Sequence, residues 1–327
     1  MNRAVAAAVA ALVAVSIPAS VRAADADVNT QIVDALNKLY GVHPGFRANH
    51  AKGLVVEGSF TPSAEAAKLS RSPLFAGPAV RVTARFSDAG GLPDVSDGSP
   101  QANPHGLAIK YHLPGGGETD MVLNSLKFFP VATPEDFRDL QLAAASSPPG
   151  APMSAQLKDF LAKHPSVPKA LATLGTPASL AQEQYNGIDA FIFVDAAGRR
   201  QPIRYIVSPE KVVHLSAADA AKQAPDFLMQ ELPQRLARGP VKFQVRAQLA
   251  ASSDPTKDAT QPWPADRKVV DLGTLTISKA VENSLDAQKK LLFLPGRLTV
   301  GIEVSDDPLI NARDGAYAVS FGRRVGR

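Results

Sequence analysis

The hydrophobic positions of this chain change period between a first helix and the strands that follow it. Apolar side chains recur at helical spacing in residues 29–40 and Gly41 comes directly after them, so we expect a helix that ends there. From Leu54 onward the period changes to two. In residues 79–87 apolar and polar side chains alternate, which is typical of a strand with one buried face.

Later segments extend both patterns. Because several strands follow one another early in the chain, the pattern predicts a meander or a barrel. Asp307 and Pro308 have the residue types that begin a helix, as a cap and as its first residue. The other predicted elements are strands at 54–60, 105–113, 119–125, 241–250 and 269–278, a hairpin at 191–207, short helices within 133–181, a helix at 216–237 and a C-terminal helix from Pro308 to about Phe321.

Composition narrows the class of protein. The 327 residues allow one large domain or two modest ones, and neither a repeat nor a clear boundary divides them. With 45% hydrophobic and 20% charged residues, the chain is not disordered, collagen-like or a coiled coil. The cysteine count of 0 excludes disulfides, thiolate metal sites and cysteine nucleophiles. A scattered charge of +4 and only 6% aromatic residues argue against a nucleic-acid partner.

The first residues have the pattern of an export signal. Arg3 precedes an apolar stretch, residues 4–17, that is too short to span a bilayer comfortably, and Ala23 completes a cleavage site. We expect residues 1–23 to be a signal peptide and residues 24–327 to be the mature protein, exported to a bacterial periplasm. The alternative is an uncleaved anchor. No later run approaches membrane length, so we expect no stable membrane insertion.

Two polar clusters stand beside predicted strands. His50 lies between the first helix and the first strand, where a histidine can pass a proton between two oxygens near neutral pH; the alternative is an ordinary loop histidine. Arg85 and Ser87 share one face of their strand, and Phe86 points the other way. An arginine and a small hydroxyl turned into a barrel suit an anionic ligand. The alternative is an ordinary surface strand.

A third cluster lies on the C-terminal helix. Arg313 and Tyr317 are four residues apart and therefore share one helix face. A guanidinium beside a phenol favours the phenolate. Tyrosine is one of the side chains that hold haem iron in proteins. The alternative is a packed tyrosine beside a surface arginine.

The order of these clusters resembles the haem catalase family. The runs NHAKG, RFS, NPHGLAIKYH, TDMVLNS, GIEVSDD and RDGAY follow one another from about Arg47 to Arg324, over nearly the whole mature chain. The similarity is greatest to the shorter catalase-related peroxidase branch. It implies an α+β fold, a single catalase-like domain with an antiparallel β-barrel and flanking helices, and haem b between the barrel and the C-terminal helix.

The resemblance also implies a role for each residue at a matching position. His50 matches the distal catalytic histidine, Asn124 the distal asparagine, and Ser87 the serine that hydrogen-bonds the histidine. Tyr317 matches the proximal iron ligand, held as phenolate by Arg313. The other matches are Arg47, Arg85 and Arg324 at the haem propionates, Phe137 near the haem, and Phe128 and Phe129 near the access channel.

The activity that the resemblance implies is that of a haem peroxidase, which reduces hydrogen peroxide through a ferryl intermediate with electrons from a small organic donor. A small true catalase and a catalase-fold enzyme acting on organic hydroperoxides are the alternatives. A haem-binding protein without turnover is a further one, and the set His50, Ser87 and Asn124 argues against it, because storage of haem needs no distal proton shuttle.

The chain departs from typical catalases in ways that change these expectations. It is shorter and largely lacks the parts that stabilise the catalase tetramer, so we expect a homodimer. Asn49 puts a polar group where an apolar one is usual, and His105 stands where an arginine is common. A shorter chain predicts a wider, wetter route to the haem, which favours organic reductants over dismutation.

Overall fold

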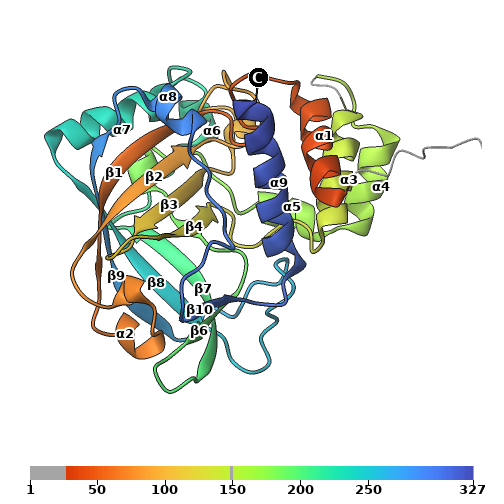
Figure 1. The fold of residues 1–327 in the computed structure, drawn as a ribbon. Coiled ribbons are helices and arrows are strands. Elements are labelled where there is room, and N and C mark those ends of the chain that lie inside the picture. The colour runs from red at the N-terminus through yellow and green to blue at the C-terminus, as the bar shows by residue number, and fades with distance from the viewer. Residues whose placement is uncertain (1–26, 148–149, 327) are drawn as a thin grey trace, which may run out of the picture.

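The computed structural model describes residues 27–147 and 150–326. The signal peptide expected at residues 1–23 lies outside the described residues. Figure 1 shows a body of strands on one side and a group of helices on the other, with the C-terminal helix between them. Among the described residues, no helix is both long and apolar enough to cross a membrane.

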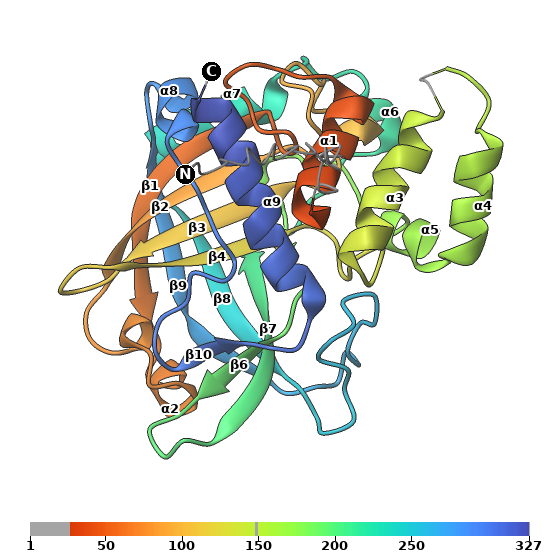
Figure 2. The same cartoon turned by 45° about the vertical axis from the view of Figure 1, so that its right-hand side comes forward.

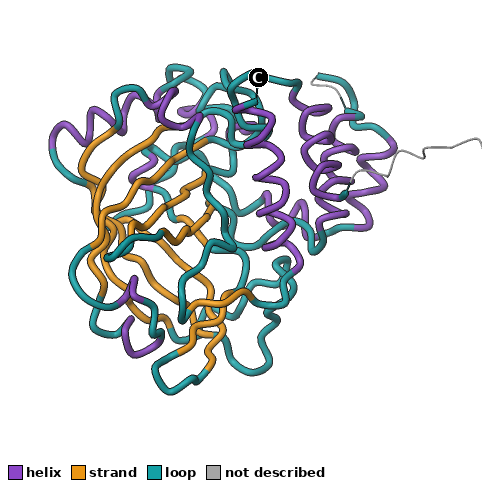
Figure 3. The backbone as a smooth tube through the Cα atoms, viewed as in Figure 1, coloured by secondary structure: helices purple, strands orange, loops and turns teal. Residues whose placement is uncertain are grey.

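Antiparallel strands close into a barrel, as the tube in Figure 3 shows. Within the described residues, the ring runs β7–β5–β4–β3–β2–β1–β9–β8, and β8 pairs again with β7. Strands β6 and β10 extend the sheet beyond this ring. The bounds are β1 (Gly53–Pro62), β2 (Val80–Ser87), β3 (Gly106–His112), β4 (Glu118–Asn124), β5 (Tyr185–Asn186), β6 (Phe191–Val194), β7 (Arg200–Pro209), β8 (Val241–Leu249), β9 (Val269–Ala280) and β10 (Ile302–Val304).

The interior of the barrel is filled with apolar side chains. On β2, Val82, Ala84 and Phe86 belong to this core. Phe86 packs on two further aromatic rings of the core, with 5.6 Å between its centroid and that of Tyr185. The expectation that Arg85 and Ser87 turn into the barrel is therefore wrong. Because successive side chains of a strand point to opposite faces, Arg85 and Ser87 face outward, toward the helices.

Helices cover this outer face, as Figure 2 shows for the C-terminal helix α9 and the first helix α1. Helix α1 packs against both α3 and α9. Asp307 caps α9 by accepting from the Leu309 N–H, with Pro308 following, as predicted. The bounds are α1 (Val28–Tyr40), α2 (Ala66–Leu69), α3 (Pro134–Ala145), α4 (Ala155–Lys163), α5 (Ser166–Leu171), α6 (Ala217–Ala220), α7 (Phe227–Arg238), α8 (Ser284–Lys289) and α9 (Pro308–Val325).

The expectation of a single helix at 216–237 is wrong, because the structure has two helices there. Helix α6 and helix α7 are separated by residues 221–226. Pro225 lacks an N–H and restricts the residue before it, so it interrupts a helix. Its carbonyl oxygen accepts hydrogen bonds from the Asp97 N–H and from Lys52 Nζ. The C-terminal helix also runs beyond the expected Phe321, to Val325.

Candidate active site

A cavity lies between the outer face of strands β2 to β4 and the helices α1, α3 and α9. Its volume is ≈ 340 Å³, in the range of small-molecule sites. The structure brings the expected catalytic, haem-binding and iron-binding residues into its wall. These are Arg47, His50, Arg85, Ser87, Asn124, Phe137, Arg313, Tyr317 and Arg324.

His50 lies in the loop before β1 and has a left-handed backbone, with φ 55°. Such a backbone is uncommon for a residue with a side chain, and contacts from several sides hold this one. Arg85 Nη2 donates to the carbonyl oxygens of His50 and Ala51, at 2.9 and 3.2 Å. The Ala51 N–H donates to the Gly90 carbonyl. The loop is therefore tied to β2 and to the segment that follows it.

The ring of His50 is oriented through its Nδ1 atom. Nδ1 lies 2.8 Å from the backbone carbonyl oxygen of Asp88 and 3.2 Å from Ser87 Oγ. A carbonyl oxygen only accepts, so Nδ1 carries the proton and Nε2 is left with a lone pair. The structure thus places Ser87 where the sequence comparison expected it, against His50.

The surroundings keep this histidine neutral. Burial lowers the pKa of His50 to about 4, and the positive charges of Arg85, Arg313 and Arg47 act in the same direction. A neutral imidazole with a bare Nε2 can accept a proton at pH 7.

Asn124 ends strand β4 beside this histidine. Its Oδ1 accepts from the Leu126 N–H at 2.9 Å, which fixes the orientation of the amide. The Nδ2 group makes no hydrogen bond to any described residue, so it is a donor for a molecule in the cavity. Opposite Asn124 in the ladder is Gly106. A Cβ on Gly106 would lie 2.7 Å from Ser87 Oγ and 3.2 Å from His50 Nδ1, so only glycine fits there.

Tyr317 approaches the cavity from helix α9. Arg313 lies one turn earlier and its Nε is 3.3 Å from the Tyr317 hydroxyl oxygen. Arg313 also forms an ion pair with the buried Asp189. Burial lowers the pKa of Arg313, but Asp189 and Tyr317 more than offset this and the net shift is upward. Arg313 is therefore a permanent cation that points at the phenol oxygen.

Three arginines gather at one end of the cavity: Arg47, Arg85 and Arg324. Arg47 and Arg324 donate to the same carbonyl oxygen, that of Leu291, at 2.9 and 3.0 Å. Arg85 donates through Nε to Gln288 Oε1. Burial, together with Arg85 and Arg324, holds the pKa of Arg47 well below its usual range. None of the three forms an ion pair with a described carboxylate, so this end of the cavity can bind anionic groups.

Apolar side chains line the rest of the wall. Phe137, on α3, stacks on Phe129 with ring centroids 5.6 Å apart. Both line the cavity, whereas Phe128 packs in a small core cluster beside it. Leu171, at the end of α5, belongs to the wall and is 52% exposed. The cavity therefore meets solvent beside α5.

Some residues of the site were not identified from the sequence. Asp189 and Gln288 orient Arg313 and Arg85, yet they lie 124 and 203 residues away along the chain. Gly53 leaves room for Arg85, because a Cβ there would lie 2.4 Å from Arg85 Nη2. No local pattern marks such partners. Gly106 could have been identified from the sequence, because it lies in the run NPHGLAIKYH, which is part of the family resemblance.

Comparisons with known proteins identify the family of the chain. The catalase family model matches residues 29–327. The catalase-related peroxidase of Mycolicibacterium paratuberculosis is 37% identical over 301 residues, which cover 90% of this chain and 94% of the relative. The catalase-related peroxidase of Synechococcus elongatus is 34% identical over 300 residues, with 90% and 88% covered.

Solved structures show the same fold. A fungal catalase superposes with a TM-score of 0.77 at 21% identity, over 86% of this chain and 60% of that chain. Catalase A from Saccharomyces cerevisiae gives a TM-score of 0.75 at 20% identity, over 86% and 61%. The chain thus spans about three fifths of the length of these solved catalases.

Proposed function

This chain belongs to the catalase family, and from that premise we propose that it is a haem-dependent peroxidase that reduces hydrogen peroxide with electrons from a small organic donor. The single observation that carries the proposal is the neutral His50, whose bare Nε2 faces the same cavity as the Tyr317 phenol. A proton acceptor and a tyrosine oxygen that can bind iron, together in one cavity, suit peroxide cleavage on iron.

The residues of the cavity fit haem b. Arg47, Arg85 and Arg324 form no ion pair with a carboxylate of residues 27–147 or 150–326 and would bind its two propionates. The apolar wall would cover the faces of the macrocycle. Tyr317, with Arg313 beside its oxygen, would hold the iron.

Haem, when bound, supplies the redox chemistry that breaks the O–O bond. The side chains of this chain then handle the protons. Nε2 of His50 accepts the proton of hydrogen peroxide and returns it to the oxygen that leaves as water. Ser87 and the Asp88 carbonyl hold the ring in place during both transfers. Asn124 donates a neutral hydrogen bond through Nδ2.

The test is to mix the purified, haem-loaded protein with hydrogen peroxide in a stopped-flow instrument, without and then with an organic donor. A peroxidase consumes peroxide in step with donor oxidation and releases little oxygen. Rapid oxygen release without donor would instead show a small true catalase. Preference for organic hydroperoxides over hydrogen peroxide would instead show a catalase-fold enzyme that acts on organic hydroperoxides.

The cellular location and the oligomeric state of the protein are further parts of the proposed function. We propose that residues 1–23 are removed on export to the periplasm and that the mature chain forms a homodimer. The expected first residue of the mature chain is Ala24, which N-terminal sequencing of the protein from a periplasmic extract would identify. Light scattering of the same material measures its mass, and a tetramer would contradict the proposed assembly.

A further inference from the structure

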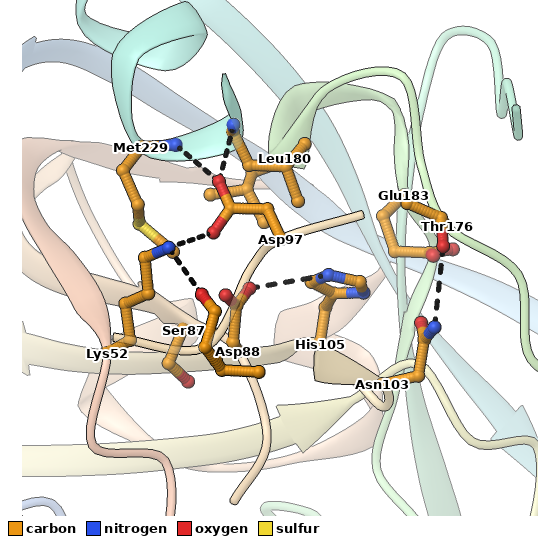
Figure 4. A network of polar contacts seen from close by, with 12 residues as sticks. Lys52, Ser87, Asp88, Asp97, Asn103, His105, Thr176, Leu180, Glu183 and Met229 are labelled. Atoms are coloured by element: carbon orange, nitrogen blue, oxygen red, sulfur yellow. Dashed lines mark hydrogen bonds and ion pairs between the residues drawn. The ribbon is translucent and has the colours of Figure 1, made fainter. Parts of the chain in front are cut away.

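A buried polar network lies directly behind His50, outside the cavity. Figure 4 shows its members, which come from segments far apart in the sequence. Asp88 follows strand β2, Asp97 lies in the loop after it, and His105 precedes strand β3. Lys52 Nζ forms an ion pair with Asp97 Oδ1 at 2.5 Å and another with Asp226 Oδ1 at 2.7 Å. Asp97 Oδ2 accepts from the Leu228 N–H at the start of α7.

Asp88 and His105 are the members without ordinary partners. Both side chains are 0% exposed, and Asp88 Oδ1 lies 3.4 Å from His105 Nε2. Among the described residues, neither Asp88 oxygen and neither ring nitrogen of His105 has a hydrogen-bond partner. A carboxyl oxygen and a ring nitrogen that face one another can bond only if one of them carries a proton: a protonated Asp88 would donate to Nε2, and the Nε2–H tautomer of His105 would donate to an ionised Asp88.

Burial and the neighbouring Asp97 favour the proton on the Asp88 carboxyl group. They raise its pKa to about 9, against the opposing positive charges of Lys52 and Arg85. Burial lowers the pKa of His105 to about 3. The charged and titratable groups that face this pair from the surrounding elements are Lys52, Arg85 and Asp97 around Asp88, His50 and His214 around His105, and Tyr185 from strand β5.

The backbone of Asp88 connects this pair to the active site. Its carbonyl oxygen is the partner of His50 Nδ1, at 2.8 Å, and its N–H donates to the Lys52 carbonyl at 3.2 Å. The backbone of Asp88 therefore carries the atom that sets the tautomer and the direction of the His50 ring, and its buried carboxyl group belongs to the same residue. His105 is the residue that stands in place of the common arginine. An arginine at this position would add a second cation, besides Lys52, near Asp88, and Asp88 would then lose its proton.

We propose that Asp88 is a positioning residue: its carboxyl group, kept neutral and facing His105, anchors the carbonyl oxygen that orients His50. The role of His50 as a base rests on the proposed function, but the protonated state of Asp88 does not. Ionisation of Asp88 would put a second negative charge beside Asp97 and remove the donor that anchors the segment.

The test compares Asp88→Leu, Asp88→Asn and the control Asp94→Asn, an exposed residue of the same loop. The first readout is infrared absorption of the purified protein at neutral pH. Because the pKa of Asp307 is also raised, to about 7, we expect the carboxylic-acid C=O band of the wild type and of Asp94→Asn to be weaker in Asp88→Asn by the contribution of one group. This readout requires neither bound haem nor turnover. A band of equal strength in the wild type and Asp88→Asn would overturn the proposal.

The second readout is the rate at which cyanide binds to the haem-loaded protein, because hydrogen cyanide must give its proton to the distal base. We expect Asp88→Leu to slow association ~10-fold, the size of one lost orienting hydrogen bond. Asp88→Asn, which keeps a donor, should restore most of the rate. Equal rates in Asp88→Leu and the wild type would contradict the positioning role. If Asp88→Leu does not fold, a tenfold loss in Asp88→Asn would contradict it instead.

The third readout is the pH dependence of the carboxylic-acid band. The wild type and Asp94→Asn should lose the contribution of one group as the pH rises through about 9, where Asp88 ionises, and Asp88→Asn should not. The same alkaline loss in Asp88→Asn would sink the proposal. A wild type that shows the band and the profile but no donor oxidation would leave the positioning role intact and refute the proposed function.

Discussion

The protonation state and the orientation of His50 are set by its surroundings. Burial and three arginines keep the ring neutral, and the Asp88 carbonyl leaves the lone pair on Nε2. Ser87 adds a hydroxyl at the same nitrogen. The base is therefore ready at neutral pH, and both its direction and its protonation state are set by neighbours.

This environment predicts the pH dependence of both rate and stability. The pKa of His50 is lowered to about 4, below the unfolded value of 6.5, so the folded state binds fewer protons. The stability that this residue contributes is present above pH 6.5 and is lost as the pH falls through about 4. Activity should also fall as the pH drops through about 4, because a protonated His50 cannot accept the proton of the substrate. Thermal unfolding and initial rates between pH 3 and 7 measure both, and an acid limit near 6.5 would contradict the lowered pKa.

Replacement of the base should slow the reaction and leave the cofactor bound. In His50→Ala the cavity keeps its arginines and Tyr317, so haem should still bind. Peroxide consumption should slow by ~10²–10⁴-fold, the usual contribution of a general acid–base group. His164→Ala is the matched control, because His164 lies at the end of α4 and outside the cavity wall. Near-normal rates in His50→Ala would exclude the proton-transfer role.

Replacement of the proposed iron ligand should have the opposite pattern. Tyr317→Phe removes the phenol oxygen, so we expect haem binding to be lost or its absorption spectrum to shift. Tyr40→Phe is the control, because Tyr40 lines the same cavity from α1. Haem titration followed by absorption spectroscopy measures both variants. A wild-type spectrum in Tyr317→Phe would remove this residue as the ligand.

At the scale of elements, the site depends on how closely strand β3 passes the His50 loop. Gly106→Ala would place a Cβ 2.7 Å from Ser87 Oγ, so either the strand or the serine must move. We expect a large loss of peroxide turnover and a lower melting temperature. Gly322→Ala, on helix α9, meets nothing within 4 Å and should preserve activity and stabilise the protein slightly. Turnover and thermal unfolding are measured for both variants. The first variant tests the close approach of β3 to the His50 loop, and the second tests the effect of helix propensity alone.

At the scale of the molecule, the anion-binding end of the cavity is assembled from three separate segments. Arg47 comes from the loop after α1, Arg85 from β2 and Arg324 from the end of α9. Arg324→Ala should weaken haem affinity ~10–100-fold, as expected for a lost charge-assisted hydrogen bond. Arg323→Ala is the control, since Arg323 instead forms an ion pair with Asp34. Equal haem affinity in both variants would exclude Arg324 from propionate binding.

Local sequence patterns were enough to predict most elements of this fold. The alternation in 79–87 and the cap at Asp307 depend only on neighbouring residues, so strand β2 and the start of α9 were predicted correctly. The break between α6 and α7 was missed, although Pro225 marks it. Strand β5 was also missed, because a two-residue strand carries too short a pattern to recognise.

The sequence by itself determined the chemistry and the order of its parts: a histidine before the first strand, a serine in β2 and a tyrosine one turn after an arginine. Only the tertiary structure decided which face of β2 meets the cavity, because alternation shows that two faces differ but not what covers each. Tertiary structure also brought Asp189 to Arg313 and Asp88 to His105. Such partners are chosen by the closure of the barrel and the packing of helices on its outer face, which no local pattern records.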